Sequence, residues 1–329
     1  MKRSLRIPFD PFLGVLLLTV ATASLWPAQG EVSRWLGTVA TAAIVMLFFL
    51  HGARLPRESL LEALGHWRLH GTILSLTFIV LPLVTLSLAL LLPGVLPPEL
   101  WVGLLFLSAL PSTVQSAIAF TSMARGNVAA SVASAAASNL IGIAATPFLM
   151  SLLTRTHSDA ISFSGVWKIV LQLLLPFALG HLCRPLLGAW AQRRKKLLQF
   201  TDRGTIVLAV YSAFSAAVVG GIWQQVSATS LAVLICICLG LLGFMLVTSI
   251  YLARAFGFSR ADEISVVMGG AQKSLVTGVP MARVLFSPAD VGAAILPVMI
   301  YHQAQLLACT WLARRYARQG NAATSAAET

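Results

Sequence analysis

Ten stretches of about 20 almost uninterrupted apolar residues recur along the 329-residue chain. A helix of that length crosses the hydrocarbon core of a bilayer, which is about 30 Å thick. The sequence does not contain the ten-residue alternating segments that are typical of a membrane β-barrel. It therefore predicts an all-α polytopic membrane protein with about ten transmembrane helices. The expected spans are residues 11–27, 35–53, 69–92, 100–122, 127–153, 163–187, 202–222, 229–253, 263–285 and 290–313.

The composition supports this class of protein. Apolar residues make up 57% of the chain, charged residues make up 10%, and the mean hydropathy is +0.84. Soluble domains carry about 25% charged residues, so an ordinary soluble enzyme and a disordered chain are excluded. The net charge of +12 does not indicate a nucleic-acid partner, because Lys and Arg lie in short clusters between the apolar spans. We expect these clusters to attract anionic lipid headgroups at the cytoplasmic face.

The distribution of positive charge predicts the orientation in the inner (plasma) membrane. If the chain starts in the cytoplasm and crosses ten times, 18 Lys and Arg lie in inner segments and four in outer segments. Cytoplasmic loops carry such an excess, so both termini are expected in the cytoplasm. The basic start and Ala21-Thr22-Ala23 also fit a cleaved signal peptide. We favour a retained first span, because the apolar run continues to Trp26. The Ala- and Ser-rich tail after Gly320 is expected to be disordered.

Metal and cofactor sites are not expected. Four cysteines lie in or beside apolar stretches without a CxxC pair, and His66 and His70 have no third ligand nearby in the sequence. Neither pattern has the spacing of a zinc site or of a disulfide framework.

A short pattern occurs twice, five spans apart. Six residues separate Ser116 from Met123-Ala124-Arg125, and six separate Ser274 from Met281-Ala282-Arg283. The two copies fall in spans of opposite orientation, which is the signature of an inverted repeat. We therefore predict a five-plus-five repeat, with residues 1–153 as the first half and 154–313 as the second. Residues 314–329 would form a cytoplasmic tail.

Both repeated spans contain helix-breaking and polar residues. Pro111 interrupts the first, and Gly269, Gly270 and Pro280 interrupt the second. Freed backbone groups are tolerated inside a membrane only against protein or a water-filled cavity. Interrupted helices at matching positions of two halves indicate the central site of a transporter. The alternative interpretation is that the small residues only allow close helix packing.

Several segments resemble the bile acid:sodium symporter family. Residues 124–129 (ARGNVA), with Ser131 beyond them, resemble the end of its crossing helix. Residues 110–116 (LPSTVQS) and 273–282 (KSLVTGVPMA) are similar to its divergent SBF-like bacterial branch, as is Tyr301-His302-Gln303. The resemblance implies core and panel domains formed from both repeats, with two discontinuous helices that cross. It also implies secondary transport of organic anions driven by sodium.

Two positions depart from the sodium-coupled members. Where the resemblance implies a sodium-binding Glu four residues before Gln272, this chain has Met268, and Thr77 stands where the family has a Gln. The acidic residues of the chain all fall in loops or at the ends of predicted spans. Hydroxyl and amide oxygens near Gln115, Ser116 and Gln272 could still hold sodium. A sodium ion and a proton therefore both stay open as the coupling ion.

Lys273 lies near the middle of the predicted span 263–285. A buried ammonium inside a membrane is destabilising unless it is paired, solvated or deprotonated. Lys273 could replace a bound sodium, bind an anionic substrate or release its proton during the cycle. His302 is a weaker candidate for a substrate contact or a proton relay. The predicted substrate- or ion-binding residues are Thr77, Ser112, Thr113, Gln115, Ser116, Ser131, Gln272, Lys273, Ser274, Thr277 and His302.

These features favour a secondary transporter of small organic anions that works by alternating access, with weak or no sodium dependence. A non-transporting sensor with the same fold and a cation/proton antiporter stay open as alternatives. An enzyme is not expected, because the adjacent Lys273 and Ser274 diverge by about 100° on a helix and make a poor catalytic pair. The sequence also contains neither GxSxG nor HExxH. The expected partners are a small organic anion and the lipid bilayer.

Overall fold

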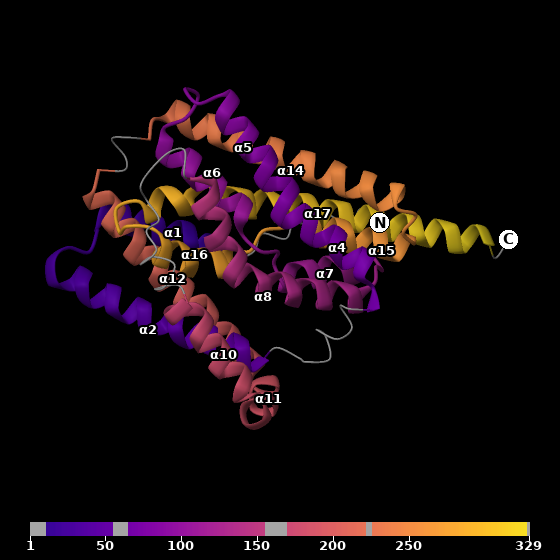
Figure 1. The fold of residues 1–329 in the computed structure, drawn as a ribbon, viewed down its shortest axis with the longest axis horizontal. Coiled ribbons are helices and arrows are strands. Elements are labelled where there is room, and N and C mark those ends of the chain that lie inside the picture. The colour runs from indigo at the N-terminus through magenta and orange to yellow at the C-terminus, as the bar shows by residue number, and fades with distance from the viewer. Residues whose placement is uncertain (1–10, 55–64, 155–169, 222–225, 328–329) are drawn as a thin grey trace, which may run out of the picture.

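The computed structural model describes residues 11–54, 65–154, 170–221 and 226–327, and these ranges contain helices and no strand. Two short segments are π-helical turns, η1 (Leu76–Val80) and η2 (Val170–Leu174). The α-helices, labelled as in Figure 1, are α1 (Pro11–Leu25), α2 (Gly30–Arg54), α4 (Trp67–Ser75), α5 (Leu81–Leu91), α6 (Pro98–Ala109), α7 (Gln115–Met123), α8 (Val128–Leu153), α10 (Leu175–Leu182), α11 (Arg184–Arg193), α12 (Lys195–Val219), α14 (Ala228–Ala255), α15 (Arg260–Gly270), α16 (Leu275–Leu285) and α17 (Val291–Ala327).

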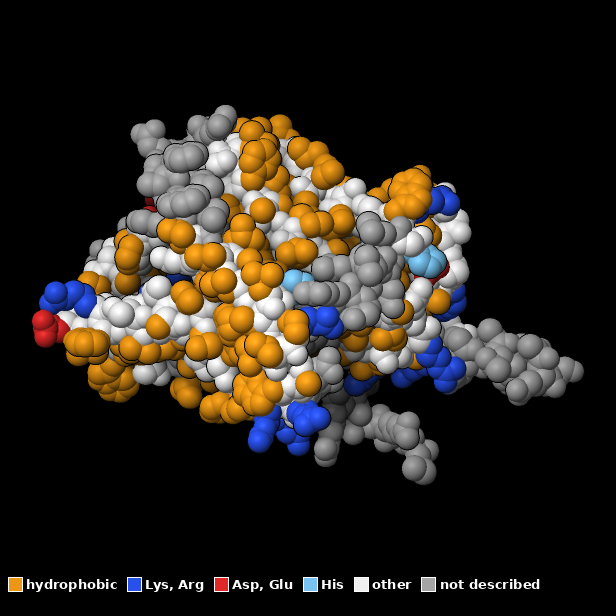
Figure 2. Space-filling model, turned by 60° about the horizontal axis from the view of Figure 1, so that its bottom comes forward, with side chains coloured by type: hydrophobic (Ala, Val, Ile, Leu, Met, Phe, Trp, Pro, Cys, Tyr) orange, Lys and Arg blue, Asp and Glu red, His pale blue; other side chains and the backbone are white. Residues whose placement is uncertain are grey.

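The helices are those of a polytopic membrane protein. Six continuous helices within the described residues are long and apolar enough to span a bilayer. A seventh span is formed if the segment Leu171–Leu182 is joined to Arg184–Ala191, which turns by 90° after Cys183. Apolar side chains cover much of the face shown in Figure 2, as expected for a surface in contact with lipid.

Two of the ten predicted spans are interrupted. Residues 100–122 form α6 and α7, and residues 263–285 form α15 and α16, so neither is one continuous helix. The expectation that Pro280 interrupts the second span is wrong, because Pro280 lies inside the continuous helix α16. Neighbouring groups in a membrane bundle tolerate the loss of one N–H donor to proline. The predicted span 11–27 corresponds to the shorter helix α1. Residues 163–169 of the predicted span 163–187 lie outside the described residues.

Two predicted boundaries are wrong. The tail after Gly320 is not disordered, because α17 continues to Ala327. Alanine has the highest helix propensity, and the tail extends a helix that is already nucleated. The helix predicted to start at residue 202 begins at Lys195. Asp202 therefore lies about two turns inside α12, where Arg54 neutralises it.

The helices pack in two groups, each drawn from both halves of the chain. The first helix group consists of α1, α2, α10, α11 and α12, and the second consists of α4 to α8 and α14 to α17. In Figure 1, α2, α10 and α11 lie on the opposite side of the molecule from α5 and α14. The two groups meet where α12 contacts α16 and α17. The candidate site lies at this junction.

Candidate functional site

Two helix breaks form the centre of the site. The first break separates Ala109, the last residue of α6, from Gln115, the first residue of α7. The second break separates Gly270, the last residue of α15, from Leu275, the first residue of α16. Pro111 lacks a backbone N–H and disfavours the helical conformation at the residue before it, which explains why α6 stops there.

The two breaks are bonded to each other. The backbone N–H of Ser274 donates to the carbonyl of Pro111 at 2.9 Å. The hydroxyl of Ser112 donates to the carbonyl of Gly269 at 2.6 Å. The hydroxyl of Ser116 donates to Oε1 of Gln272 at 2.7 Å. Ser116 and Gln272, which belong to the two repeated spans, are therefore in direct contact.

Side chains of α8 satisfy the backbone of the first break. Thr146 donates its hydroxyl proton to the carbonyl of Ala109 at 2.8 Å. The N–H of Ser112 donates to the hydroxyl of Ser138 at 3.0 Å, and Nδ2 of Asn139 donates to the carbonyl of Ser112 at 2.8 Å. Buried backbone groups without such partners would be strongly destabilising.

Side chains of α17 do the same for the second break. The hydroxyl of Tyr301 donates to the carbonyl of Ala271 at 2.8 Å. The amide of Gln305 bonds both backbone groups of Lys273: Oε1 accepts from the N–H at 2.7 Å, and Nε2 donates to the carbonyl at 2.9 Å. Each break is thus fixed by the helix that follows the interrupted span, α8 after α7 and α17 after α16.

The side chain of Lys273 is fully buried between these breaks and a third segment. Its Nζ donates to the carbonyls of Thr77, Ser108 and Leu110 at 2.8, 2.6 and 2.7 Å. The ring of Phe78 lies 5.9 Å from Nζ, within the range of a cation–π interaction. The ammonium does not face the cavity, because Lys273 is absent from its walls.

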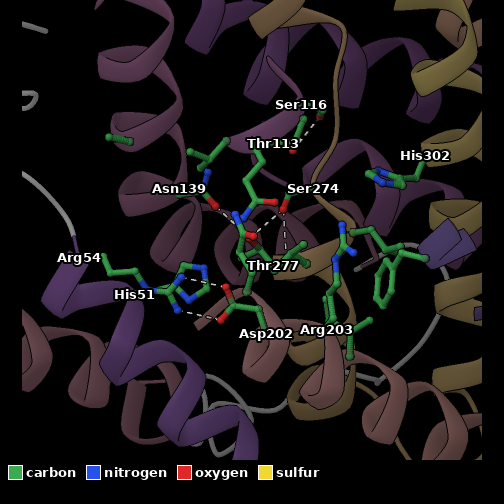
Figure 3. A pocket seen from close by; sticks show the side chains of 18 of the residues that line it. His51, Arg54, Thr113, Ser116, Asn139, Asp202, Arg203, Ser274, Thr277 and His302 are labelled. Atoms are coloured by element: carbon green, nitrogen blue, oxygen red, sulfur yellow. Dashed lines mark hydrogen bonds and ion pairs between the residues drawn. The ribbon is translucent and has the colours of Figure 1, made fainter. Parts of the chain in front are cut away.

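A cavity of about 280 Å³ lies between the two helix groups. The second helix group supplies side chains from both breaks and from α8, including Thr113, Ser274 and Asn139. The first helix group supplies Arg54 and Arg203 from the opposite wall. Figure 3 shows these residues facing one another across the cavity.

The charged side chains give the cavity an excess of positive charge. Arg54 and Asp202 form a two-bond ion pair, with Nη1–Oδ2 and Nη2–Oδ1 distances of 2.9 and 2.8 Å. Arg203 has no carboxylate partner among the described residues, and its guanidinium lies 5.1 Å from the ring centre of Phe12. Within the described residues, the guanidinium of Arg203 is therefore not neutralised by a carboxylate.

The N-termini of α7 and α16 add to this positive character. Gln115 and Leu275, their first residues, both line the cavity. The hydroxyl of Ser274 caps α16 by accepting from the N–H of Thr277 at 3.2 Å. The remaining free N–H groups of a helix start carry a partial positive charge, which favours an anion.

Comparison with known proteins identifies the family. The sequence profile of the SBF-like CPA transporter family matches residues 10–318. The chain belongs to this family. “Putative symporter YfeH” of Escherichia coli (strain K12) is 48% identical over 310 residues, which cover 94% of this chain and 93% of that protein. “Sodium/bile acid cotransporter 7” of Rattus norvegicus is 28% identical over 310 residues, which cover 92% of this chain and 91% of that protein.

The family assignment confirms the resemblance predicted from the motif segments. A further relative, “Sodium/bile acid cotransporter 7-B” of Xenopus laevis, is 29% identical over 304 residues, which cover 90% of this chain and 88% of that protein. The family and these relatives carry the names of membrane transporters. This SBF-like protein is therefore a transporter and not an enzyme.

The structure divides the predicted site residues of the SBF-like protein into two sets. Those that line the cavity are Thr113, Gln115, Ser116, Ser274, Thr277 and His302. Those that lie elsewhere are Thr77, Ser112, Ser131, Gln272 and Lys273. Thr77 contributes its carbonyl to Lys273, and Ser131 accepts a bond from the hydroxyl of Thr121 at 3.2 Å. The second set joins helices to one another.

Several cavity residues of the SBF-like protein were missed by the sequence analysis. They are His51, Arg54, Asn139, Gln199, Asp202 and Arg203. A polar amide inside the apolar span 127–153 is a signal that could have identified Asn139. Arg54 and Asp202 are 148 positions apart in the sequence, and each lies near the end of a predicted span. Neither therefore has a local signal that distinguishes it from an interfacial residue.

Proposed function

We propose that this SBF-like protein is a secondary transporter of small organic anions in the plasma membrane. The observation that carries the proposal is the cavity between the two helix groups, into which two helix N-termini and Arg203 project. Two relatives are named sodium/bile acid cotransporters, and a bile acid is an organic anion.

The walls of the cavity suit an amphipathic anion. Apolar side chains such as Phe177, Ile206 and Leu140 form much of the lining. The guanidinium of Arg203 and the N–H groups at the start of α16 lie on opposite walls. An anion bound by one carboxylate or sulfonate, with an apolar body, would satisfy both kinds of surface.

Alternating access would occur by movement of one helix group against the other. The first helix group would be the panel domain and the second the core domain. The proposed five-plus-five repeat, with halves 1–153 and 154–313, is supported by the equivalent bonding of the two breaks. In each half, the helix that follows the interrupted span satisfies the backbone of its break, α8 in the first half and α17 in the second.

The cavity would be open to the cytoplasm in this conformation. Arg54, Gln199 and Asp202 line it, and all three belong to segments that we predict on the cytoplasmic side. On the other side, α16 contacts α12. The end of α16 also approaches α2, since a Cβ at Gly37 would lie 3.7 Å from Nη2 of Arg283. These contacts would close the cavity toward the outside.

We propose little dependence on sodium. Ser116 and Gln272, two of the side chains predicted near a sodium ion, are bonded to each other. Asp202, which lines the cavity, is paired with Arg54. A proton is the other candidate coupling ion, and it would leave the transport rate dependent on a pH gradient.

Uptake into proteoliposomes tests the proposal. Purified protein is reconstituted, and entry of radiolabelled cholate and of p-toluenesulfonate is compared with protein-free vesicles. Saturable uptake of either anion supports the proposal. Binding of an anion to the protein without uptake would indicate a sensor. A change in internal pH on adding Na⁺ or K⁺, without anion uptake, would indicate a cation/proton antiporter.

A further inference from the structure

We infer that the ammonium of Lys273 is a built-in monovalent cation, which fills a carbonyl cage where a free ion would otherwise bind. The carbonyl cage consists of the backbone oxygens of Thr77, Ser108 and Leu110. Its consequence for transport rests on the proposed function, but the cage itself does not. A covalently attached cation cannot be released on the other side of the membrane, so this position carries no coupling ion.

Each oxygen of the cage is free for a separate structural reason. In an ordinary helix the N–H of Leu81 would bond the carbonyl of Thr77, but in η1 it bonds Leu76 instead. The next position is Pro82, which has no N–H. The carbonyl of Thr77 is therefore left without a backbone donor from its own helix.

The other two oxygens are free because α6 ends beside them. The N–H of Ser112, which would bond the carbonyl of Ser108 in a continuous helix, donates to the hydroxyl of Ser138 at 3.0 Å. Leu110 lies in the break and has an extended backbone, with φ −69° and ψ 150°. Three unsatisfied carbonyls thus converge on one point, as in a site where carbonyl oxygens replace the water around an ion.

The number of bonds indicates that Lys273 is charged. Nζ lies 2.6 to 2.8 Å from three acceptor oxygens, and a carbonyl oxygen cannot donate. An ammonium has three N–H groups, whereas a neutral amine has two and would turn a lone pair toward the third oxygen. No ion pair of the described residues involves Lys273, so backbone dipoles and the ring of Phe78 stabilise this charge.

The tethered ammonium also holds three segments together. Thr77 belongs to η1, Ser108 to α6, and Lys273 to the second break. A free ion would join the same segments only while it was bound. Replacing the ion with a side chain makes the bonded arrangement of the two breaks independent of salt composition.

Removal of the amine should therefore create a cation site. In Lys273→Ala, the cage and the space of the side chain are empty, and a small monovalent cation can enter. We expect NaCl, KCl or NH₄Cl, at about one hundred times the dissociation constant, to raise the melting temperature of purified Lys273→Ala by about 3–5 °C relative to N-methyl-D-glucamine chloride. The wild type and Lys196→Ala, which removes an exposed lysine, should shift by about 1 °C or less in the same salts.

A second variant controls for the space created. Methionine fills most of the space of the lysine stem without supplying a charge. Lys273→Met should therefore bind methylammonium or larger alkylammonium ions at least about tenfold more weakly than Lys273→Ala. Equal stabilisation of both variants and of the wild type by every salt would show that no specific cage site exists, and would overturn the inference. If neither variant can be purified folded, saturable stabilisation of the wild type by Na⁺ would overturn it, and insensitivity to Na⁺ would support it.

Uptake separates this inference from the proposed function. Wild-type anion uptake should change less than about twofold when Na⁺ and K⁺ are replaced by N-methyl-D-glucamine. Uptake by Lys273→Ala should fall at least about tenfold in that salt and recover in the salt that stabilises it best. If the wild type transports no anion, the proposed function fails while the melting data still decide the cage. If wild-type uptake requires Na⁺ and Lys273→Ala keeps that requirement, the inference fails while the transport function stands.

Discussion

The amide of Gln305 bonds both backbone groups of Lys273 and is itself fully buried. In Gln305→Leu, a buried N–H and a buried C=O would lose their partners. We expect a loss of about 2–6 kcal/mol in the free energy of unfolding, since each of the two unsatisfied buried groups costs about 1–3 kcal/mol. Thermal melting of the purified variant in detergent measures the change.

Gln303 provides the matched control for this variant. It lies two residues away on α17, is partly exposed and makes no side-chain hydrogen bond to the described residues. Gln303→Leu should change stability by about 0.5 kcal/mol or less. Equal destabilisation by the two variants would show that the double bond to Lys273 is not what holds the second break.

Arg203 is the cavity guanidinium without a carboxylate partner among the described residues, which makes it the expected contact for an anionic substrate. Arg203→Gln keeps a polar side chain and removes the charge. We expect the half-saturating anion concentration for uptake to rise about tenfold, which corresponds to about 1.4 kcal/mol. Arg194→Gln, at an exposed position outside the cavity, should leave it unchanged. An unchanged value for Arg203→Gln would remove Arg203 from the substrate site.

At the scale of elements, α2 and α10 pack with their backbones in close approach. A Cβ at Gly180 would overlap the carbonyl of Phe49, and a Cβ at Gly52 would overlap the carbonyl of Phe177. Small residues permit such contacts between helices in membranes. We expect Gly180→Ala to destabilise the first helix group by about 1–3 kcal/mol, because the two helices must move apart.

Gly240 in α14 is the control for this effect, because a Cβ there would meet no atom within 4 Å. Gly240→Ala should leave stability unchanged or raise it by up to about 1 kcal/mol, since alanine favours a helix. Melting temperatures of the two variants, measured in the same detergent, provide the comparison. A Gly180→Ala protein as stable as Gly240→Ala would contradict the close packing of α2 against α10.

At the scale of the whole molecule, single cysteines in a chain lacking the four native cysteines test the orientation. A membrane-impermeant thiol reagent added to intact cells should label Val95→Cys, in a predicted outer loop. It should label Arg193→Cys only after the membrane is made permeable, because the positive-charge distribution predicts a cytoplasmic position. The reverse pattern would contradict the proposed topology. Residues 1–8 and 155–160, which the sequence also predicts inside and outside, lie outside the described residues.

A third cysteine tests which side the cavity opens to. Leu140 lies near the middle of α8 and lines the cavity. Leu140→Cys should react at least about tenfold faster from the cytoplasmic side, in inside-out vesicles, than from the outside in intact cells. Faster labelling from the outside would show that the protein rests in the opposite conformation.

The sequence determined the class of protein, most of the spans and the location of the two breaks. A long apolar run indicates that a segment is stable in lipid, and this stability depends mainly on the residues of the segment itself. Pro111, Gly269 and Gly270 interrupt their helices through their own backbone chemistry, so the breaks were also predictable. The motif segments were sufficient to identify the SBF-like family.

Only the tertiary structure decided what surrounds each of these residues. Arg54 meets Asp202 across 148 positions of sequence, and Lys273 finds carbonyls 163 to 196 positions away. Backbone carbonyls are present in every residue, so no side-chain pattern indicates which of them are free. The sequence likewise does not indicate which of the predicted site residues face the cavity and which join helices to one another. Apolar spans specify that a helix enters the membrane, but the choice of its neighbours depends on the packing of the whole bundle.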